Sequence, residues 1–195
     1  MCSSDLKGGE CPLQDLTFRY GPGTSRMTLP KRTYEKPLPI SSSIVLDRER
    51  CILCYRCTRF SSDVSADGEL VARERGSQSV IATFEERPYA SAFSGNVTEL
   101  CPVGALLPTA YRFKARPWEI VNVPTVCTGC ATGCNTWSTL REGRVERVLS
   151  RNHPGIDDGW LCDKGRFARW EPRDERIAGP LERGDRKSTC LNSSH

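Results

Sequence analysis

The pattern of apolar and polar positions along the chain predicts only short elements. A helix is predicted over residues 13–20, because Pro12 suits the first turn of a helix and Gly21 suits its end. The stretch that follows it, LPKRTYEKPLPISSS, contains three prolines and favours an extended, polyproline-like backbone. This stretch has little capacity to bury itself, so we expect it to run over the surface of another part of the protein.

Two later segments alternate between apolar and polar residues, as strands do. The first, GELVARERGSQSVIATF, predicts short strands around a turn at Gly76. The second, CNTWSTLREGRVERVLS, predicts a hairpin that turns at Glu142-Gly143. The apolar positions on the two sides of that turn are Trp137, Leu140, Val145 and Val148.

The composition limits how large a core these elements can build. The chain has 195 residues, which is room for one or two small domains. Only 37 % of them are hydrophobic, which is below the usual share of a globular domain. A large self-sufficient core is therefore not expected, and the fold needs another source of stability.

Charge and hydropathy exclude several classes of partner. The net charge is only +4, and no basic stripe with interleaved aromatic residues is present, so we expect no nucleic-acid partner. No run of about 18 apolar residues exists, so we expect no direct membrane insertion. The start MCSSDLKGGE lacks the apolar region of a secretory signal.

The 11 cysteines indicate metal ligation, because without an export signal disulfides are the weaker explanation. Three of them, Cys51, Cys54 and Cys57, are each separated by two residues, and Cys101 follows far downstream before a proline. A tight triple with a remote Cys-Pro is the ligand pattern of a [4Fe–4S] cluster. The spacing therefore predicts that these four cysteines, the first quartet, share one cluster.

A second group of four cysteines follows. Cys127, Cys130 and Cys134 lie in CTGCATGC, and Cys162 lies in GWLCDKGRF after the predicted hairpin. The glycines between the first three allow the chain to fold tightly around a cluster and to expose backbone N–H groups. We expect this second quartet to hold a second [4Fe–4S] cluster.

Other chemistries remain open for both quartets. Zinc competes for the first, although zinc sites usually come as pairs of Cys-x2-Cys. A redox-active disulfide competes for the second, although it leaves two further cysteines unexplained. Cations near a cluster of thiolates would stabilise its negative charge, and equally they could be solvated surface residues. These cations are Arg48, Arg50, Arg56 and Arg59.

The first segment of the chain offers an incomplete site. Cys11, in GGECPLQ, resembles a fourth ligand followed by proline, and Cys2 lies nine residues earlier. Asp5 stands where a middle cysteine is expected, and no histidine precedes it. Cys190 lies in a polar tail without periodicity and is expected to be a free thiol with no role.

Seven motifs together resemble the large iron–sulfur subunit of bacterial NADH:quinone oxidoreductase, respiratory complex I. They occur in the order of that family and cover residues 7–171. They are KGGECPLQDL, KRTYEKPLPISS, LDRERCILCYRCTRF, TELCPVGAL, YRFKARPWE, CTGCATGC and GWLCDKGRF.

The resemblance implies an α+β chain of small cluster-binding domains. Residues 1–42 would be the remnant of a His/Cys3-type [4Fe–4S] segment with its proline-rich linker, and residues 43–116 a ferredoxin-like [4Fe–4S] domain. Residues 117–180 would be the β-rich [4Fe–4S] domain that opens a region of the molybdopterin-oxidoreductase type. Residues 181–195 would be a disordered or non-native tail. A [2Fe–2S] cluster is expected only in the N-terminal part that this chain lacks.

The first site departs from the family. Its cluster takes one histidine and three cysteines, of which Cys2 and Cys11 match two, while Asp5 replaces the third. The histidine would lie before Met1, and neither His153 nor His195 is placed to substitute for it. We therefore expect two stable [4Fe–4S] clusters, with the third site incomplete.

In function, the resemblance implies an electron-relay subunit of a proton-translocating NADH dehydrogenase. Its partners would be the other complex I subunits, including the one that binds flavin and NADH, and its place would be peripheral, at the cytoplasmic face of the bacterial inner membrane. The first quartet would lie on the main relay and the second off it. No residue is assigned a catalytic role.

Two alternatives stay open at this point. The front end of a molybdopterin oxidoreductase, such as an NAD-linked formate dehydrogenase, also resembles CTGCATGC and WLCDKGR. Such chains usually carry two ferredoxin-type quartets with the fourth cysteine close by, whereas here Cys101 is distant. The other alternative is a zinc scaffold without redox function, which would contain zinc and no acid-labile sulfide.

Overall fold

The computed structural model describes residues 7–22 and 24–168 of the chain. Its α-helices are α1 (Pro12–Tyr20), α2 (Arg56–Arg59), α3 (Asn96–Leu100) and α4 (Asp163–Phe167). Its strands are β1 (Leu38–Pro39), β2 (Ile44–Leu46), β3 (Leu70–Arg73), β4 (Val80–Thr83), β5 (Leu106–Pro108), β6 (Val121–Val126), β7 (Asn135–Arg141) and β8 (Arg144–Ser150). Short 3₁₀ turns cover Arg48–Arg50, Gly76–Gln78, Phe84–Glu86 and Pro117–Glu119, and a π-helical turn covers Phe60–Val64. The expected α+β class is confirmed.

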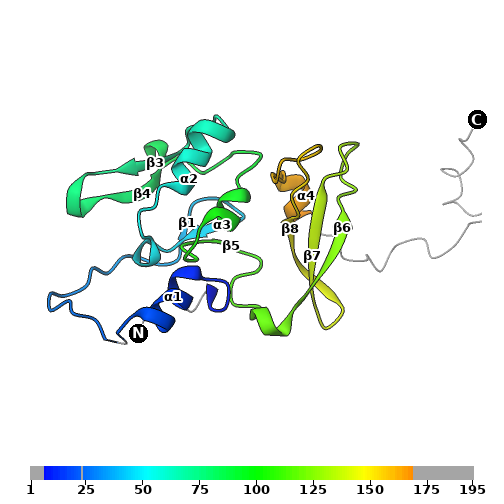
Figure 1. Cartoon of the computed structure of the whole chain (residues 1–195). Coiled ribbons are helices and arrows are strands. Elements are labelled where there is room, and N and C mark those ends of the chain that lie inside the picture. Colours follow the sequence, from blue (N-terminus) through cyan, green and yellow to red (C-terminus); the bar gives the residue numbers. More distant parts are fainter. Residues whose placement is uncertain (1–6, 23, 169–195) are drawn as a thin grey trace, which may run out of the picture.

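Two halves are visible in Figure 1, one built around β1 to β5 with α1 to α3, the other around β6 to β8 with α4. In the first half, β2 lies between β1 and β5 and pairs antiparallel with both. The strands predicted around Gly76 are confirmed, because β3 and β4 form an antiparallel pair joined through the turn at Gly76–Gln78. The small sheet of β1, β2 and β5 was not predicted, because its strands are two or three residues long and leave no readable alternation.

The apolar core lies in the first half and includes thiols. Ile44, Leu46, Ile81, Val97 and Leu106 are almost fully buried. The same cluster of contacting residues contains Cys11, Cys57 and Cys101. Cysteines thus occupy places where a self-sufficient domain would have larger aliphatic side chains, as expected for a fold that relies on its ligand for stability.

The second half is a three-stranded antiparallel sheet in the order β6-β7-β8. The predicted hairpin is confirmed as β7 and β8, with a register shift between Thr139 and Leu140. Strand β6 was missed because Pro124 interrupts its apolar positions. An edge strand accepts a proline, since one side of its backbone has no ladder partner, and β6 is such an edge.

Helix α1 confirms the predicted N-terminal helix. Its Pro12 occupies the first turn, and the Gly21 N–H donates to the Thr17 carbonyl at 2.8 Å where the helix ends. The proline-rich run after it has no helix or strand between residues 24 and 37 and is exposed except at Tyr34. None of the helices in the described ranges has the length and hydrophobicity needed to span a bilayer.

Candidate metal centres

The first quartet is assembled by a tightly wound loop and one distant helix. Cys51 follows a 3₁₀ turn and Cys57 lies in α2. Between them the backbone is left-handed at Leu53 (φ 53°) and Tyr55 (φ 59°), a conformation that costs non-glycine residues about 1–2 kcal/mol each. Such strain is typical of functional sites, and here it turns three cysteines of a short segment toward one centre.

Cys101 completes this quartet from the C-terminal end of α3, where its N–H donates to the Val97 carbonyl at 3.0 Å. All four cysteines line one narrow hollow. Its remaining walls are mostly apolar, with Leu46, Ile52, Ile81, Val103, Ala105 and Leu106 among them. The structure therefore brings together the four cysteines that the sequence grouped.

The thiols of the first quartet are close enough to influence one another. Burial raises the pKa of the Cys57 thiol to about 12, and the neighbouring Cys101, Cys51 and Cys54 contribute to this rise. Burial likewise raises the pKa of Cys51. Cys51 and Cys57 therefore hold their protons more tightly than a free thiol does, and a metal that binds here must displace these protons.

Three cysteines of the second quartet lie in the connection between β6 and β7, and the fourth, Cys162, lies at the start of α4. The Cys127 N–H donates to the Cys134 carbonyl at 2.8 Å and closes the loop that carries Cys130. Cys162 precedes α4, and its sulfur accepts from the Gly165 N–H at 3.4 Å. Burial raises the pKa of Cys134, with smaller contributions from Asp157 and from the other three thiols of the quartet.

Gly165 leaves space beside the second quartet. A side chain at this position would take up room that a bound group needs. A Cβ there would lie 3.0 Å from the Cys127 sulfur and 3.7 Å from the Cys162 sulfur. The two sulfurs thus face the same glycine from the sheet and from α4. A cluster fits this donor set, because three thiolates of one loop and a fourth from the start of α4 can each bind a separate iron.

We expect Gly165→Ala to weaken the second cluster selectively. The methyl group would meet the Cys127 sulfur and the Leu161 side chain, both at 3.0 Å, and overpacking of this kind costs about 1–3 kcal/mol. Iron release to a chelator, followed by the absorbance and EPR signal of each cluster, should become faster at the second site only. Gly155→Ala is the matched control, because its Cβ would meet only His153 at ordinary contact distance. Equal release rates in the two variants would contradict this role of Gly165.

The nine cysteines of the described residues are all free thiols. Within the same ranges, no three side chains of His, Cys, Asp or Glu converge around a single-ion position. The thiolates of a [4Fe–4S] cluster lie further apart than the ligands of zinc, because each thiolate binds its own iron rather than one shared ion.

The first segment is only partly described. Cys11 is fully buried, and its sulfur accepts from the Gln14 N–H at 3.4 Å as the N-cap of α1. Cys2 and Asp5 lie outside the described residues, as does Cys190. Among the described residues, no group of three His, Cys, Asp or Glu side chains that could hold a metal ion forms around Cys11, and the incomplete site stays a prediction.

The arginines around the first quartet have different partners. Arg48 donates to the Ile81 carbonyl at 3.3 Å, and Arg50 pairs with Asp47 at 2.9 Å. Arg59 donates to the Cys54 carbonyl at 3.3 Å, whereas Arg56 is exposed. Among their side chains, only that of Arg59 donates to the backbone of a quartet residue, and the stabilising role expected of the group stays a prediction.

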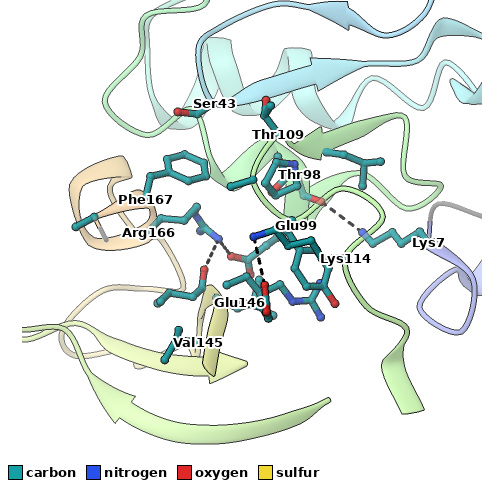
Figure 2. Close-up of a pocket in the computed structure, with 18 of the residues that line it drawn as sticks. Lys7, Ser43, Thr98, Glu99, Thr109, Lys114, Val145, Glu146, Arg166 and Phe167 are labelled. Carbon is teal, nitrogen blue, oxygen red and sulfur yellow. Dashed lines mark hydrogen bonds and ion pairs between the residues drawn. The ribbon is translucent and has the colours of Figure 1, made fainter. Parts of the chain in front are cut away.

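Sequence reasoning missed the cation that does reach the first quartet from elsewhere. The Lys7 ammonium donates to the Cys101 carbonyl at 2.6 Å, across 94 positions of sequence. No spacing rule links these two residues, although Lys7 opens the motif KGGECPLQDL. It lines a cavity of about 680 Å³ between the two halves, where Figure 2 shows it close to α3.

Two family models match the chain. Residues 41–107 match the ferredoxin-like domain of NADH-quinone oxidoreductase subunit 3, and residues 120–170 match the molybdopterin oxidoreductase Fe4S4 domain. The first match contains the first quartet and the second match contains the second quartet. The chain therefore carries iron–sulfur domains.

Curated relatives extend this result. A subunit of the NADH-quinone oxidoreductase of Streptomyces coelicolor is 48 % identical over 91 % of this chain and 21 % of its own length. Subunit 3 of the Thermus thermophilus enzyme is 39 % identical over 93 % of this chain and 25 % of its own length. A chain of an NAD+-reducing [NiFe]-hydrogenase in the H2-reduced state aligns with a TM-score of 0.46 at 30 % identity, covering 56 % of this chain and 48 % of that one.

The chain matches only part of each relative. It spans about a fifth to a quarter of the length of these curated relatives, while they match more than nine tenths of it. Both relatives are subunits of the same enzyme, and the first family model carries the name of that enzyme as well. We therefore identify the chain as a homologue of one segment of the large iron–sulfur subunit of NADH-quinone oxidoreductase.

Proposed function

We propose that this chain is an electron-relay segment of an NADH:quinone oxidoreductase, on the route from the flavin site toward quinone. The observation that carries the proposal is the presence of two complete and separate cysteine quartets within two matched iron–sulfur domains. [4Fe–4S] clusters, when bound, accept and release single electrons. The protein's task is then to hold the clusters and adjust their potentials, and no bond to a substrate forms here.

The proposal assigns one domain to each cluster. Residues 43–116 hold the first cluster through Cys51, Cys54, Cys57 and Cys101, in a largely apolar hollow. Residues 117–180 hold the second through Cys127, Cys130, Cys134 and Cys162. The second site is more open, since the Cys130 side chain is exposed, and hydrogen bonds from Thr132 lower its pKa. The family resemblance suggests a relay role for the first cluster and a structural role for the second.

The wider assembly is part of the same proposal. The curated relatives belong by name to NADH-quinone oxidoreductases, so we propose that this chain works beside other subunits, among them one that binds flavin and NADH. We place it peripherally, at the cytoplasmic face of the bacterial inner membrane. A [2Fe–2S] cluster belongs in our proposal to sequence that precedes the residues of this chain.

An iron and acid-labile sulfide count tests this assignment. The chain purified without oxygen should contain about eight irons, since two [4Fe–4S] clusters hold four each. Asp5→Ala should leave that count unchanged, because a hard carboxylate suits iron–sulfur chemistry poorly and the incomplete site offers at most three ligands. Zinc without sulfide would contradict the relay. A count near twelve irons that falls in Asp5→Ala would show that the first segment also binds a cluster.

A further inference from the structure

Helix α3 determines where Cys101 lies, yet it is too short to be stable alone. It has five residues, whereas isolated helices below about 12–15 residues are marginal in water. Its Asn96, Val97 and Thr98 are buried, so the helix is held by what surrounds it. Two segments far away in sequence contact its two ends.

The N-terminal end of α3 is held by the segment that carries Cys162. The Asp163 carboxylate accepts from the Gly95 N–H at 2.7 Å and from the Ser94 hydroxyl at 2.5 Å. In return, the Asp163 N–H donates to the Ala92 carbonyl at 2.8 Å. A carboxylate at the start of a helix satisfies free N–H groups and complements the helix dipole.

Asn96 adds a second connection to the same segment. Its side-chain amide donates to the Leu161 carbonyl at 3.0 Å and accepts from the Leu161 N–H at 3.1 Å. Arg166 donates to the Asn96 side-chain oxygen at 2.9 Å and pairs with Glu99, as Figure 2 shows for the latter pair. Asn96 and Arg166 are almost fully buried, so these bonds are protected from water.

Lys7 holds the C-terminal end. Its ammonium donates to the Cys101 carbonyl at 2.6 Å and to the Thr98 carbonyl at 3.4 Å, the latter drawn in Figure 2. A cation satisfies free carbonyls and suits the negative end of a helix. Gly104 provides the room, since a Cβ there would lie 2.8 Å from the Lys7 Cβ and its φ of +68° favours glycine.

We propose that Lys7 and Asp163 are positioning residues for Cys101, acting from the segments of the incomplete site and of the second quartet. Through α3 they fix the one ligand of the first cluster that does not come from the Cys51–Cys57 loop. Lys7 also places a positive charge next to that ligand, which stabilises the reduced, more negative cluster and raises its reduction potential. The statement on potential rests on the proposed cluster, whereas the statement on α3 does not.

The test uses the full chain, purified without oxygen, and two pairs of variants. Lys7→Met and Asp163→Ala remove the contacts, while Lys7→Arg and Asp163→Asn keep a donor or an acceptor in place. Hydrogen exchange of the Val97–Cys101 amides should accelerate about tenfold or more in the first pair. A tenfold change corresponds to about 1.4 kcal/mol, which is the scale of a lost hydrogen bond. The conservative pair should exchange nearly as slowly as the parent chain.

Redox titration of the first cluster, followed by EPR, is the second readout. Lys7→Met should lower the midpoint potential, and Lys7→Arg should restore it. Lys114→Met is the matched control, because Lys114 lines the same cavity but pairs with Glu146 at 3.4 Å instead of contacting α3. Lys114→Met makes the same change of charge as Lys7→Met. It should change the hydrogen exchange of α3 and the midpoint potential less than Lys7→Met does.

Each outcome decides one statement. Unchanged exchange in Lys7→Met and Asp163→Ala would overturn the positioning role. Faster exchange with an unchanged potential in Lys7→Met would overturn the electrostatic role and leave Lys7 as a structural residue. A parent chain without iron would overturn the proposed function, and the exchange data would still decide whether Lys7 and Asp163 hold α3.

Discussion

Cys54→Ala is expected to abolish the EPR signal of one [4Fe–4S] cluster and to leave the other at full intensity. Cys54 belongs to the quartet that lines the apolar hollow, and none of the second quartet shares that hollow. Losing one thiolate leaves one iron without its protein ligand in a site whose walls are mostly apolar. The iron count should fall by about four, one [4Fe–4S] cluster per chain.

Cys130→Ala is the reciprocal variant. It should remove the second signal and preserve the first, because Cys130 lies in the loop between β6 and β7. Both signals persisting at full iron occupancy in Cys54→Ala would show that the ligands are assigned wrongly. Loss of both signals in each variant would show instead that the two sites cannot be occupied independently.

The sequence predicted those elements whose ends or turns are determined by residues close to them in the chain. The Pro12 start of α1, the Gly76 turn and the Glu142-Gly143 hairpin all follow from backbone preferences of proline and glycine. The grouping of the cysteines was predictable for the same reason, because ligand spacing within a short loop is a local property. The structure brings both groups together as expected.

Elements held by distant contacts could not be predicted. Helix α3 spans only five residues and depends on Lys7 and Asp163, which lie about 90 and 70 positions away along the sequence. Strand β6 depends on its pairing with β7, which overrides the proline in its middle. Side chains such as Lys7 become visible as functional candidates only when the fold places them beside a ligand.

Removal of iron is expected to unfold the sheet of the second half of the molecule. This is the other large expected effect. Among its described residues, Val148 and Leu161 are the only large aliphatic side chains that are buried. Thr136 and Thr139 fill the adjacent interior positions, while Val121, Val123 and Val126 of β6 are exposed. So little buried apolar surface leaves the metal–sulfur bonds as the main source of stability, as in other small metal domains.

The geometry shows how those bonds would act. Cys127 and Cys134 lie at the adjoining ends of β6 and β7, and Cys162 lies at the start of α4, so one cluster connects the sheet to the helix. Chelation of iron should therefore reduce the circular dichroism of the sheet. Amide protection in β7 and β8 should fall at least about a hundredfold, since structural metal sites can contribute about 10 kcal/mol or more.

Two variants separate this effect from general loss of iron. In Cys54→Ala, which is expected to keep the second cluster, the amides of β7 and β8 should stay protected. In Cys130→Ala they should lose protection although the first cluster remains. A cooperative melt of the second half that is the same with and without iron would contradict the idea, because the polar contacts of Leu161, Asp163 and Arg166 with the first half would then suffice to hold the sheet.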